Sequence, residues 1–343
     1  MHLIGITRCG ATKTAASPSG EAIATAPVKT GSPCLIALDW GSTSLRAFLM
    51  DDAGETLAER TSADGASRLA GGPAAFEQAL RQLAGDWLAA YPDIAVVASG
   101  MVGSQHGWCE AKYVPCPLSF QDLHRYSAQV QGSLGLVVRI IPGVCWTSGH
   151  LAADVMRGEE IQISGLLSDH PSLAACCRVI LPGTHSKWVA VREARINSFA
   201  THMTGELFAV LRQHSVLGRL MPSDAPFDGS GFDEGVRCSR DDDGRALSQR
   251  LFSARARALL GQLSISALPD YLSGVLVGHE LVNGLRECDA DEPLVLVGEP
   301  ALCERYARAL TAFDRAPALV AGNTAARGLW HQARQAQWLH AST

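Results

Sequence analysis

Residues 35–51 read LIALDWGSTSLRAFLMD, and this stretch decides the fold. Its first apolar run ends on Asp39, and the small residues 41–44 follow as a tight turn. A second apolar run, 45–50, is interrupted only by Arg46. Two short β-prone runs that are joined by glycine and hydroxyl residues predict a β-hairpin.

The turn of this hairpin has two interpretations. Its backbone N–H groups and hydroxyls could hold phosphate oxygens, while Asp39 could hold Mg²⁺ directly or through water. In the other interpretation, the aspartate accepts hydrogen bonds from its own turn, as in many ordinary hairpins. Taken alone, the stretch favours the ordinary hairpin.

Composition excludes several classes of protein. A chain of 343 residues suggests about two domains, and 47% hydrophobic with 18% charged residues is typical of a globular protein. The net charge of −5 argues against nucleic-acid binding, and no apolar run reaches the roughly 20 residues that a membrane helix needs. The ten cysteines contain no CxxC pair, so we expect reduced thiols in a cytoplasmic enzyme.

Residues 1–33 differ from the rest of the chain. They are rich in Ala, Thr, Ser, Pro and Gly, and they show little periodicity. The apolar segment 3–6 is too short for a signal peptide. We therefore expect 1–33 to be a disordered leader outside the fold.

The chain after the hairpin predicts a mixed α/β domain. Residues 55–61 can add a third antiparallel strand, and 73–90 form a helix whose apolar residues recur at helical spacing. A buried strand at 94–98 enters the glycine-rich loop 99–104, and 136–141 form a further strand. Ligands usually bind where the strands of an α/β sheet end.

A pair of glutamates lies at the start of the next predicted helix. The apolar pattern from Ile161 to Leu166 places Glu159 and Glu160 in its first turn. There they can complement the helix N-terminus and face water, which is the commoner case. Alternatively, one of them is a general base in a cleft, with Arg157 nearby to bind an anion. Because neighbouring helix residues point about 100° apart, at most one glutamate should face such a cleft.

The opening pattern recurs about one domain length later. Residues 178–181 (RVIL) are apolar after the first, and 182–186 (PGTHS) form a turn rich in glycine and hydroxyls. Residues 187–191 resume a strand that is followed by another at 196–200. Two copies of one unit, facing each other, would place two hydroxyl-rich turns across a cleft. Further helices follow, and strands at 294–297 and 318–320 precede helices near the C-terminus. The duplication favours a phosphate-binding role for both turns.

These motifs together resemble a known superfamily. DWGSTSLR (39–46), PGTHSKW (182–188), LVGEPAL (296–302) and AGNTAARGL (321–329) look like the actin-like ATPase and sugar-kinase superfamily. Within it, the chain is similar to the 2-dehydro-3-deoxygalactonokinase family. The stretches that carry this similarity are SGMVGSQHGW (99–108), IIPG (140–143), DVMRGEEIQISG (154–165), LPGTHSKWV (181–189) and THMTGELF (201–208).

The resemblance implies the fold. It is an α/β, two-lobed actin-like ATPase (ribonuclease H-like) fold, in which each lobe is a mixed β-sheet that opens with a β-meander and is flanked by helices. The lobes would span 34–170, with the first phosphate turn and the sugar-acid site, and 171–320, with the second phosphate turn and the adenosine site. Residues 321–343 would form a helix that crosses at the hinge.

The resemblance also implies roles for individual residues. Asp39 would position Mg²⁺, and Glu160 would take the proton from the sugar hydroxyl, with Glu159 in reserve; Lys187 would stabilise charge on the transferred group. Substrate contacts would come from Gly103, Ser104, Glu159 and Arg157, with Arg68 as the second choice for the substrate carboxylate. The residues that would bind ATP are Asp39, Gly41, Ser42, Thr43, Arg46, Gly183, Thr184, His185, Lys187 and Gly298.

Two features depart from the superfamily pattern. The second turn carries Thr-His-Ser-Lys where many sugar kinases have an acidic residue or Gly-Thr-Gly, which favours a base from the first lobe. Gly298 is followed by Glu299 where a second glycine is common, and this puts the nucleotide pocket in doubt. Arg157 also has a second interpretation, as a partner of Glu160 three residues along the chain.

The expected activity is ATP- and Mg²⁺-dependent phosphorylation of the 6-hydroxyl of 2-dehydro-3-deoxy-D-galactonate in galactonate breakdown. The alternatives are a kinase of an epimeric 2-keto-3-deoxy sugar acid, a polyphosphate or nucleotide phosphohydrolase, and a non-catalytic nucleotide-binding regulator. The expected partner is a small sugar acid, with no nucleic acid and no membrane, and a homodimer is one expected assembly.

Overall fold

The computed structural model describes residues 31–148, 152–241 and 244–339. The expected leader therefore lies almost wholly outside the described residues. The first strand, β1 (Pro33–Trp40), pairs antiparallel with β2 (Leu45–Asp51), and β2 pairs with β3 (Thr56–Ser62). The predicted hairpin and its third strand are confirmed.

The first sheet has the order β3-β2-β1-β4-β8-β7. Strands β4 (Ala95–Gly100) and β8 (Val137–Ile140) run parallel to β1, and β7 (Ala128–Gln131) is antiparallel at the edge. Side chains of β1 alternate between the two faces, and both faces are buried. Ile36 and Leu38 pack with α1 (Pro73–Ala90) on the outer face, whereas Leu35 and Ala37 face the other lobe.

The second sheet repeats this arrangement. Its order is β6-β13-β12-β11-β14-β15, with the two-residue strand β6 at one edge. The meander β11 (Cys176–Leu181), β12 (Ser186–Arg192) and β13 (Arg195–His202) is extended by the parallel strands β14 (Leu294–Val297) and β15 (Leu319–Ala321). Two sheets with the same third-second-first-fourth-fifth order confirm the two-lobed actin-like fold.

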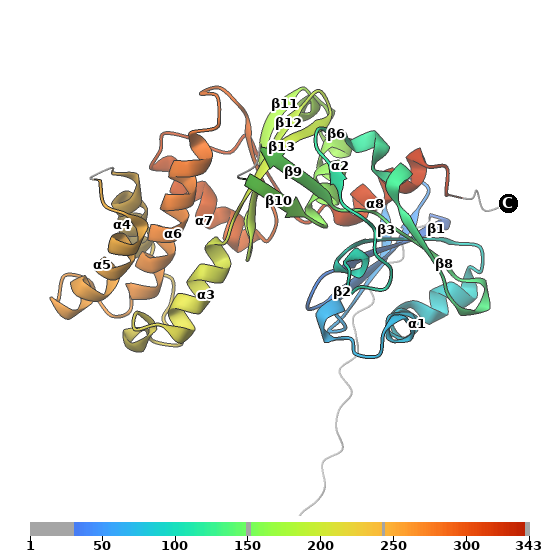
Figure 1. Ribbon diagram of the computed structural model, residues 1–343, viewed down its shortest axis with the longest axis horizontal. Coiled ribbons are helices and arrows are strands. Elements are labelled where there is room, and N and C mark those ends of the chain that lie inside the picture. The colour runs from blue at the N-terminus through green and yellow to red at the C-terminus, as the bar shows by residue number, and fades with distance from the viewer. Residues whose placement is uncertain (1–30, 149–151, 242–243, 340–343) are drawn as a thin grey trace, which may run out of the picture.

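Helices cover the outer face of the second sheet and fill the space between the sheets (Figure 1). One core joins the facing sides of both sheets to α2 (Glu159–Asp169) and α8 (Ala325–Gln335). On the outer side of the second sheet lie α3 (Thr204–His214), α4 (Gly229–Arg240), α5 (Leu247–Leu259), α6 (Leu268–Leu285) and α7 (Pro300–Thr311). None of the described helices is long and apolar enough to cross a lipid bilayer.

Helices α2 and α8 cross with their backbones in close contact. A Cβ atom on Gly165 would lie 2.2 Å from the Thr324 carbonyl oxygen, and one on Gly328 would lie 2.0 Å from the Ile161 carbonyl oxygen. Only glycine fits at either position. The Thr324 hydroxyl also donates to the Gln162 carbonyl at 2.6 Å.

A small sheet was not expected from the sequence. It pairs β9 (Val144–Ser148) with β10 (Ala152–Met156) antiparallel and with β5 (Val114–Pro115) in parallel. Nearby, β6 (Leu118–Ser119) joins the edge of the second sheet at β13. Segments of the first lobe thus reach the second, and the lobe limits at 34–170 and 171–320 stay a prediction. The described 3₁₀ helices cover Ala66–Arg68, Met101–Gly103, Phe120–Tyr126, Ser133–Gly135, Pro171–Ala174 and Gly218–Leu220.

Candidate active site

A cavity of about 640 Å³ lies where the two turns face each other. Both lobes contribute to it, as does the segment that precedes α8. Its lining includes Asp39, Gly41, Arg46, Gly100, Arg157, Glu159, Gln162, Gly183, Thr184, His185, Gly298, Glu299 and Asn323. Most of the residues that the sequence assigns to ATP are therefore brought together.

The first turn is closed by a hydrogen bond from Gly41 N to Ser44 O of 2.9 Å. It is tied to the segment after β3, because the N–H of Ser67 donates to the Ser42 carbonyl. Asp39 Oδ2 accepts from Arg46, its partner across the hairpin. Ser42 and Thr43 belong to the same turn, but they are not among the cavity-lining residues.

The second turn is held by the hydroxyl group of Ser186 and by the first turn of α3. Ser186 Oγ accepts from Gly183 N at 3.4 Å, and Glu206 N donates to the Thr184 carbonyl at 3.0 Å. A Cβ on Gly205 would meet the Gly183 carbonyl oxygen at 2.5 Å, so glycine lets α3 begin directly against the turn. His185 Nε2 contacts the carboxylate of Glu206 on this helix.

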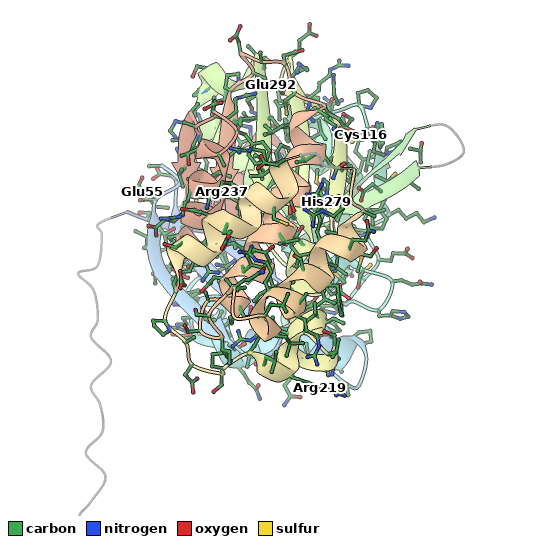
Figure 2. The ribbon with its side chains drawn as sticks, turned by 90° about the vertical axis from the view of Figure 1, so that its left-hand side faces the viewer. Glu55, Cys116, Arg219, Arg237, His279 and Glu292 are labelled. Carbon is green, nitrogen blue, oxygen red and sulfur yellow. The ribbon has the colours of Figure 1, made fainter. Side chains whose placement is uncertain are left out.

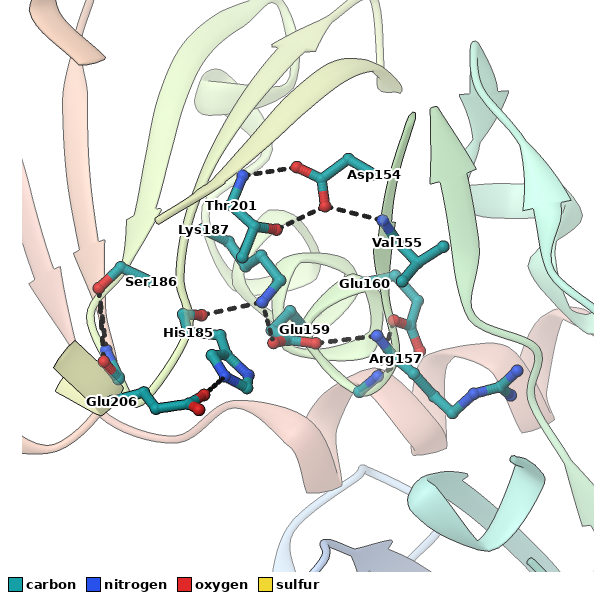
Figure 3. Close-up of polar contacts among 12 residues, drawn as sticks. Asp154, Val155, Arg157, Glu159, Glu160, His185, Ser186, Lys187, Thr201 and Glu206 are labelled. Carbon is teal, nitrogen blue, oxygen red and sulfur yellow. Dashed lines mark hydrogen bonds and ion pairs between the residues drawn. The ribbon is translucent and has the colours of Figure 1, made fainter. Parts of the chain in front are cut away.

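An ion pair crosses from one lobe to the other at the cavity (Figure 3). Lys187 Nζ on β12 lies 3.2 Å from Glu159 Oε1 at the start of α2, and it donates to the His185 carbonyl at 2.8 Å. The lysine side chain is only 6% exposed, whereas Glu159 is 23% exposed. Lys187 is therefore buried next to the second turn, and its ammonium group points towards Glu159.

Glu160 lies apart from the cavity, although the sequence favours it as the base. Its side chain is completely buried, and both carboxylate oxygens accept from Gly158 N, at 2.8 and 3.0 Å. Glu159 lines the cavity instead, and its other oxygen accepts from Arg157 N at 3.0 Å. The arrangement favours the reserve choice, Glu159, because it is the glutamate of the pair that lines the cavity.

Burial, together with the neighbouring charge of Glu159, raises the pKa of Glu160 to about 8. A carboxyl group whose pKa rises from 4.5 on folding stabilises the folded state below pH 4.5, and this contribution is lost as pH rises towards 8. We expect wild-type protein to lose about 3 kcal/mol of unfolding free energy between pH 5 and pH 8 relative to Glu160→Gln. Denaturant titrations at both pH values measure this difference. Equal pH dependence in the two proteins would contradict it.

Arg157 connects the main cavity to a second one of about 420 Å³. Its Nη2 donates to the Ala111 carbonyl at 2.8 Å, and its guanidinium carbon lies 4.3 Å from the centre of the Tyr113 ring. Nε and Nη1 are buried and have no hydrogen-bond partner among the described residues. The second cavity is lined by Ala66, Ser67, Met101, Ser104, Gln105, His106, Glu110, Tyr113 and Arg157.

The other residues expected to bind the sugar acid divide into two groups. Ser104 lines the second cavity, and Gly103 permits the approach of Arg157, since a Cβ there would lie 2.9 Å from Arg157 Nη1. Arg68 is exposed and lines neither cavity. Of the two arginines that the sequence offers, the geometry therefore favours Arg157.

A third cavity, of about 570 Å³, adjoins the second turn and lies between α3, α6 and α7. It shares Pro182, Gly183, Thr184 and Glu299 with the main cavity. Glu299, which breaks the expected glycine pair after Gly298, caps α7 by accepting from the N–H groups of Ala301 and Leu302. The Glu299 carboxylate thus stabilises the start of α7 at the boundary of the main and third cavities.

Sequence reasoning missed several residues of the site. Asn323 Nδ2 lies 3.4 Å from Asp39 Oδ2, and its place before the last helix is a signal that could have indicated it. Gln162 lies one helical turn after Glu159, so it faces the same way. Tyr113 and Ala111 reach Arg157 from a distant segment, and no local pattern points to them.

Comparisons with known proteins place the chain in one family. A family model described as 2-keto-3-deoxy-galactonokinase matches residues 39–332. A 2-dehydro-3-deoxygalactonokinase from Escherichia coli (strain K12) is 36% identical over 84% of this chain and 94% of its own length. A probable 2-dehydro-3-deoxygalactonokinase from Rhizobium meliloti (strain 1021) is 32% identical over 86% of this chain and 97% of its own.

One solved structure is similar over nearly the whole chain. It is a crystal structure of a candidate 2-dehydro-3-deoxygalactonokinase from Sinorhizobium meliloti, with 30% sequence identity and a TM-score of 0.78. The match covers 89% of this chain and 99% of that one.

Proposed function

The chain belongs to the 2-keto-3-deoxy-galactonokinase family, and from that premise we propose that it transfers the γ-phosphoryl group of ATP to the 6-hydroxyl of 2-dehydro-3-deoxy-D-galactonate. The observation that carries the proposal is the cavity at which both small-residue turns, an inter-lobe Lys–Glu pair and a partly unpaired arginine meet. Phosphoryl transfer depends mainly on positioning and charge neutralisation, for which this combination is suited.

The phosphates of ATP would lie between the two turns. Gly183 leaves space above the second turn, since a Cβ there would meet no atom within 4 Å. Arg46 and Lys187 would neutralise charge that develops on the transferred group, together with backbone N–H groups of the turns. The adenosine would occupy the third cavity, which adjoins the main cavity next to Gly298 and Glu299.

Glu159 would accept the proton from the attacking hydroxyl. Its carboxylate lines the cavity and is held by the Arg157 N–H and by Lys187. A bound phosphate competes with Glu159 for the lysine ammonium group. When the phosphate draws Lys187 away, the Glu159 carboxylate oxygen that faced the lysine becomes available to the attacking hydroxyl, so proton removal is coupled to the presence of ATP.

The residues at the first turn fit Mg²⁺. This ion usually binds proteins through one or two carboxylates and completes its shell with water and substrate phosphates. Asp39 lines the cavity, and its Oδ2 atom takes the contacts from Arg46 and Asn323, which leaves Oδ1 for a metal-bound water. Held through Asp39, a Mg²⁺ ion would offset the negative charge of the ATP phosphates.

The substrate carboxylate would bind Arg157. A guanidinium group with two unpaired buried N–H groups matches the two oxygens of a carboxylate. Ser104, His106 and Glu110 in the second cavity would contact the hydroxyls of the sugar acid. These contacts are what we expect to separate one epimer from another.

The state of the cysteines bears on where in the cell the protein works. The nine described cysteines are all free, which fits a reducing, cytoplasmic location. A homodimer stays a prediction.

Coupled assays test the function directly. ADP release from MgATP is expected to depend on added 2-keto-3-deoxy sugar acid, and kcat/KM over a panel of epimers is expected to be highest for 2-dehydro-3-deoxy-D-galactonate. Phosphate release without any sugar acid would contradict the kinase and would instead support a phosphohydrolase.

A further inference from the structure

A buried carboxylate, Glu280, lies behind the second turn and has no part in the steps above. It comes from α6, and it is 1% exposed. Its Oε1 atom accepts from Trp188 Nε1 at 2.8 Å, and its Oε2 atom accepts from Tyr306 OH at 2.7 Å and from the Thr204 hydroxyl. All three donors are uncharged, so hydrogen bonds take the place of water around this carboxylate.

The bonds continue from Glu280 to the second turn in one direction. Tyr306 uses its single hydrogen on Glu280, so its oxygen must accept from Ser186 Oγ, which lies 3.0 Å away. Ser186 then has its lone pairs free for the N–H of Gly183. Donation therefore runs from the turn, through Ser186 and Tyr306, to the carboxylate.

Glu280 also holds two other elements that flank the nucleotide space. Thr204 is the first residue of α3, whose N-terminal turn abuts Gly183 and Thr184. Trp188 follows Lys187 directly on β12. One carboxylate thus fixes the turn, the start of α3 and the strand that carries Lys187. Thr204 and Tyr306 themselves line the third cavity.

We propose that Glu280 is a positioning residue for nucleotide binding, which acts through Tyr306 and Ser186 to hold the second turn in its phosphate-binding conformation. The inference rests on the proposed function, because it takes the second turn and the third cavity as the ATP site. Glu280 touches no substrate, and its effect is on how tightly nucleotide binds.

The test replaces Glu280 by Gln and measures the Kd for MgADP by calorimetry. Either orientation of the amide spoils a contact, because its NH₂ group would face the Trp188 N–H or would reverse the hydroxyl bonds of Tyr306 and Thr204. We expect Kd for MgADP and KM for ATP to rise about tenfold, with KM for the sugar acid unchanged. Tyr306→Phe should raise both ATP-site constants similarly, and the double variant should add little, since both changes break one path.

Glu292→Gln is the matched control, because Glu292 is another buried carboxylate of the same lobe. It binds Arg192 at 2.8 Å and lines none of the three cavities. Figure 2 places it near the upper edge of the ribbon, well above His279, which adjoins Glu280 in α6. The control is expected to lose stability but to keep its affinity for MgADP.

Three outcomes would overturn the inference. They are an unchanged Kd in Glu280→Gln, an unchanged Kd in Tyr306→Phe, and an equal rise in Glu292→Gln. Failure of wild-type protein to bind MgADP would instead contradict the proposed function, so the two failures are distinguishable.

Discussion

Replacing Glu159 by Gln is expected to lower kcat by about 10²- to 10⁴-fold, the range typical for loss of a general base. The amide keeps the shape of the side chain but cannot take a proton from the attacking hydroxyl. KM for ATP should change much less than kcat, because Lys187 remains to bind the phosphates. Steady-state kinetics with both substrates varied would measure the two effects separately.

The adjacent position gives the control for this experiment. Glu160→Gln changes a carboxylate that is buried against its own backbone, so most of the activity should remain. If Glu160→Gln were the inactive variant and Glu159→Gln retained normal turnover, the base would be Glu160, as the resemblance to related enzymes implies.

Replacing Arg157 by Met is expected to raise KM for the sugar acid about 100-fold, because two charged hydrogen bonds to the carboxylate are lost. Met keeps a long apolar side chain beside the Tyr113 ring, so the wall of the cavity is largely retained. KM for ATP should stay close to the wild-type value. Initial rates over a wide range of sugar-acid concentration provide the measurement.

Arg68→Met serves as the control, since Arg68 is the other arginine that the sequence suggests and its side chain is exposed. We expect wild-type kinetics from this variant. An increase in KM for the sugar acid in Arg68→Met, without one in Arg157→Met, would show that Arg68 binds the carboxylate.

The parts of the fold that the sequence predicts are those with strong local periodicity. The hairpin at 35–51 alternates between two buried faces, and the helix at 73–90 occurs with the expected ends. The sequence pattern predicts helix α4 less clearly, because this helix contains three glycines. Packing explains them, since a Cβ on Gly235 would lie 2.1 Å from the Tyr271 carbonyl oxygen of α6. Tertiary contact here overrides helix propensity.

The site is less predictable than the fold for a geometric reason. Sequence places both glutamates in the first turn of a helix, but the direction of each depends on how α2 lies between the sheets. The strands β9 and β10 are short and mixed in polarity, so their pairing has no clear signal. The Asp154 carboxylate on β10 nevertheless accepts two hydrogen bonds of 2.6 Å from Thr201 of the second lobe, one from the backbone N–H and one from the hydroxyl.

The crossing of α2 and α8 has a consequence for how the protein is made. The first lobe begins with the hairpin, yet its core includes Leu329 and Trp330 of the last helix. A ribosome delivers α8 after every other described strand and helix, and domains tend to fold as units in the order of synthesis. The first lobe therefore stays incompletely packed until α8 has been synthesised. The cavity wall at Asn323, which directly precedes α8, is completed at the same late moment.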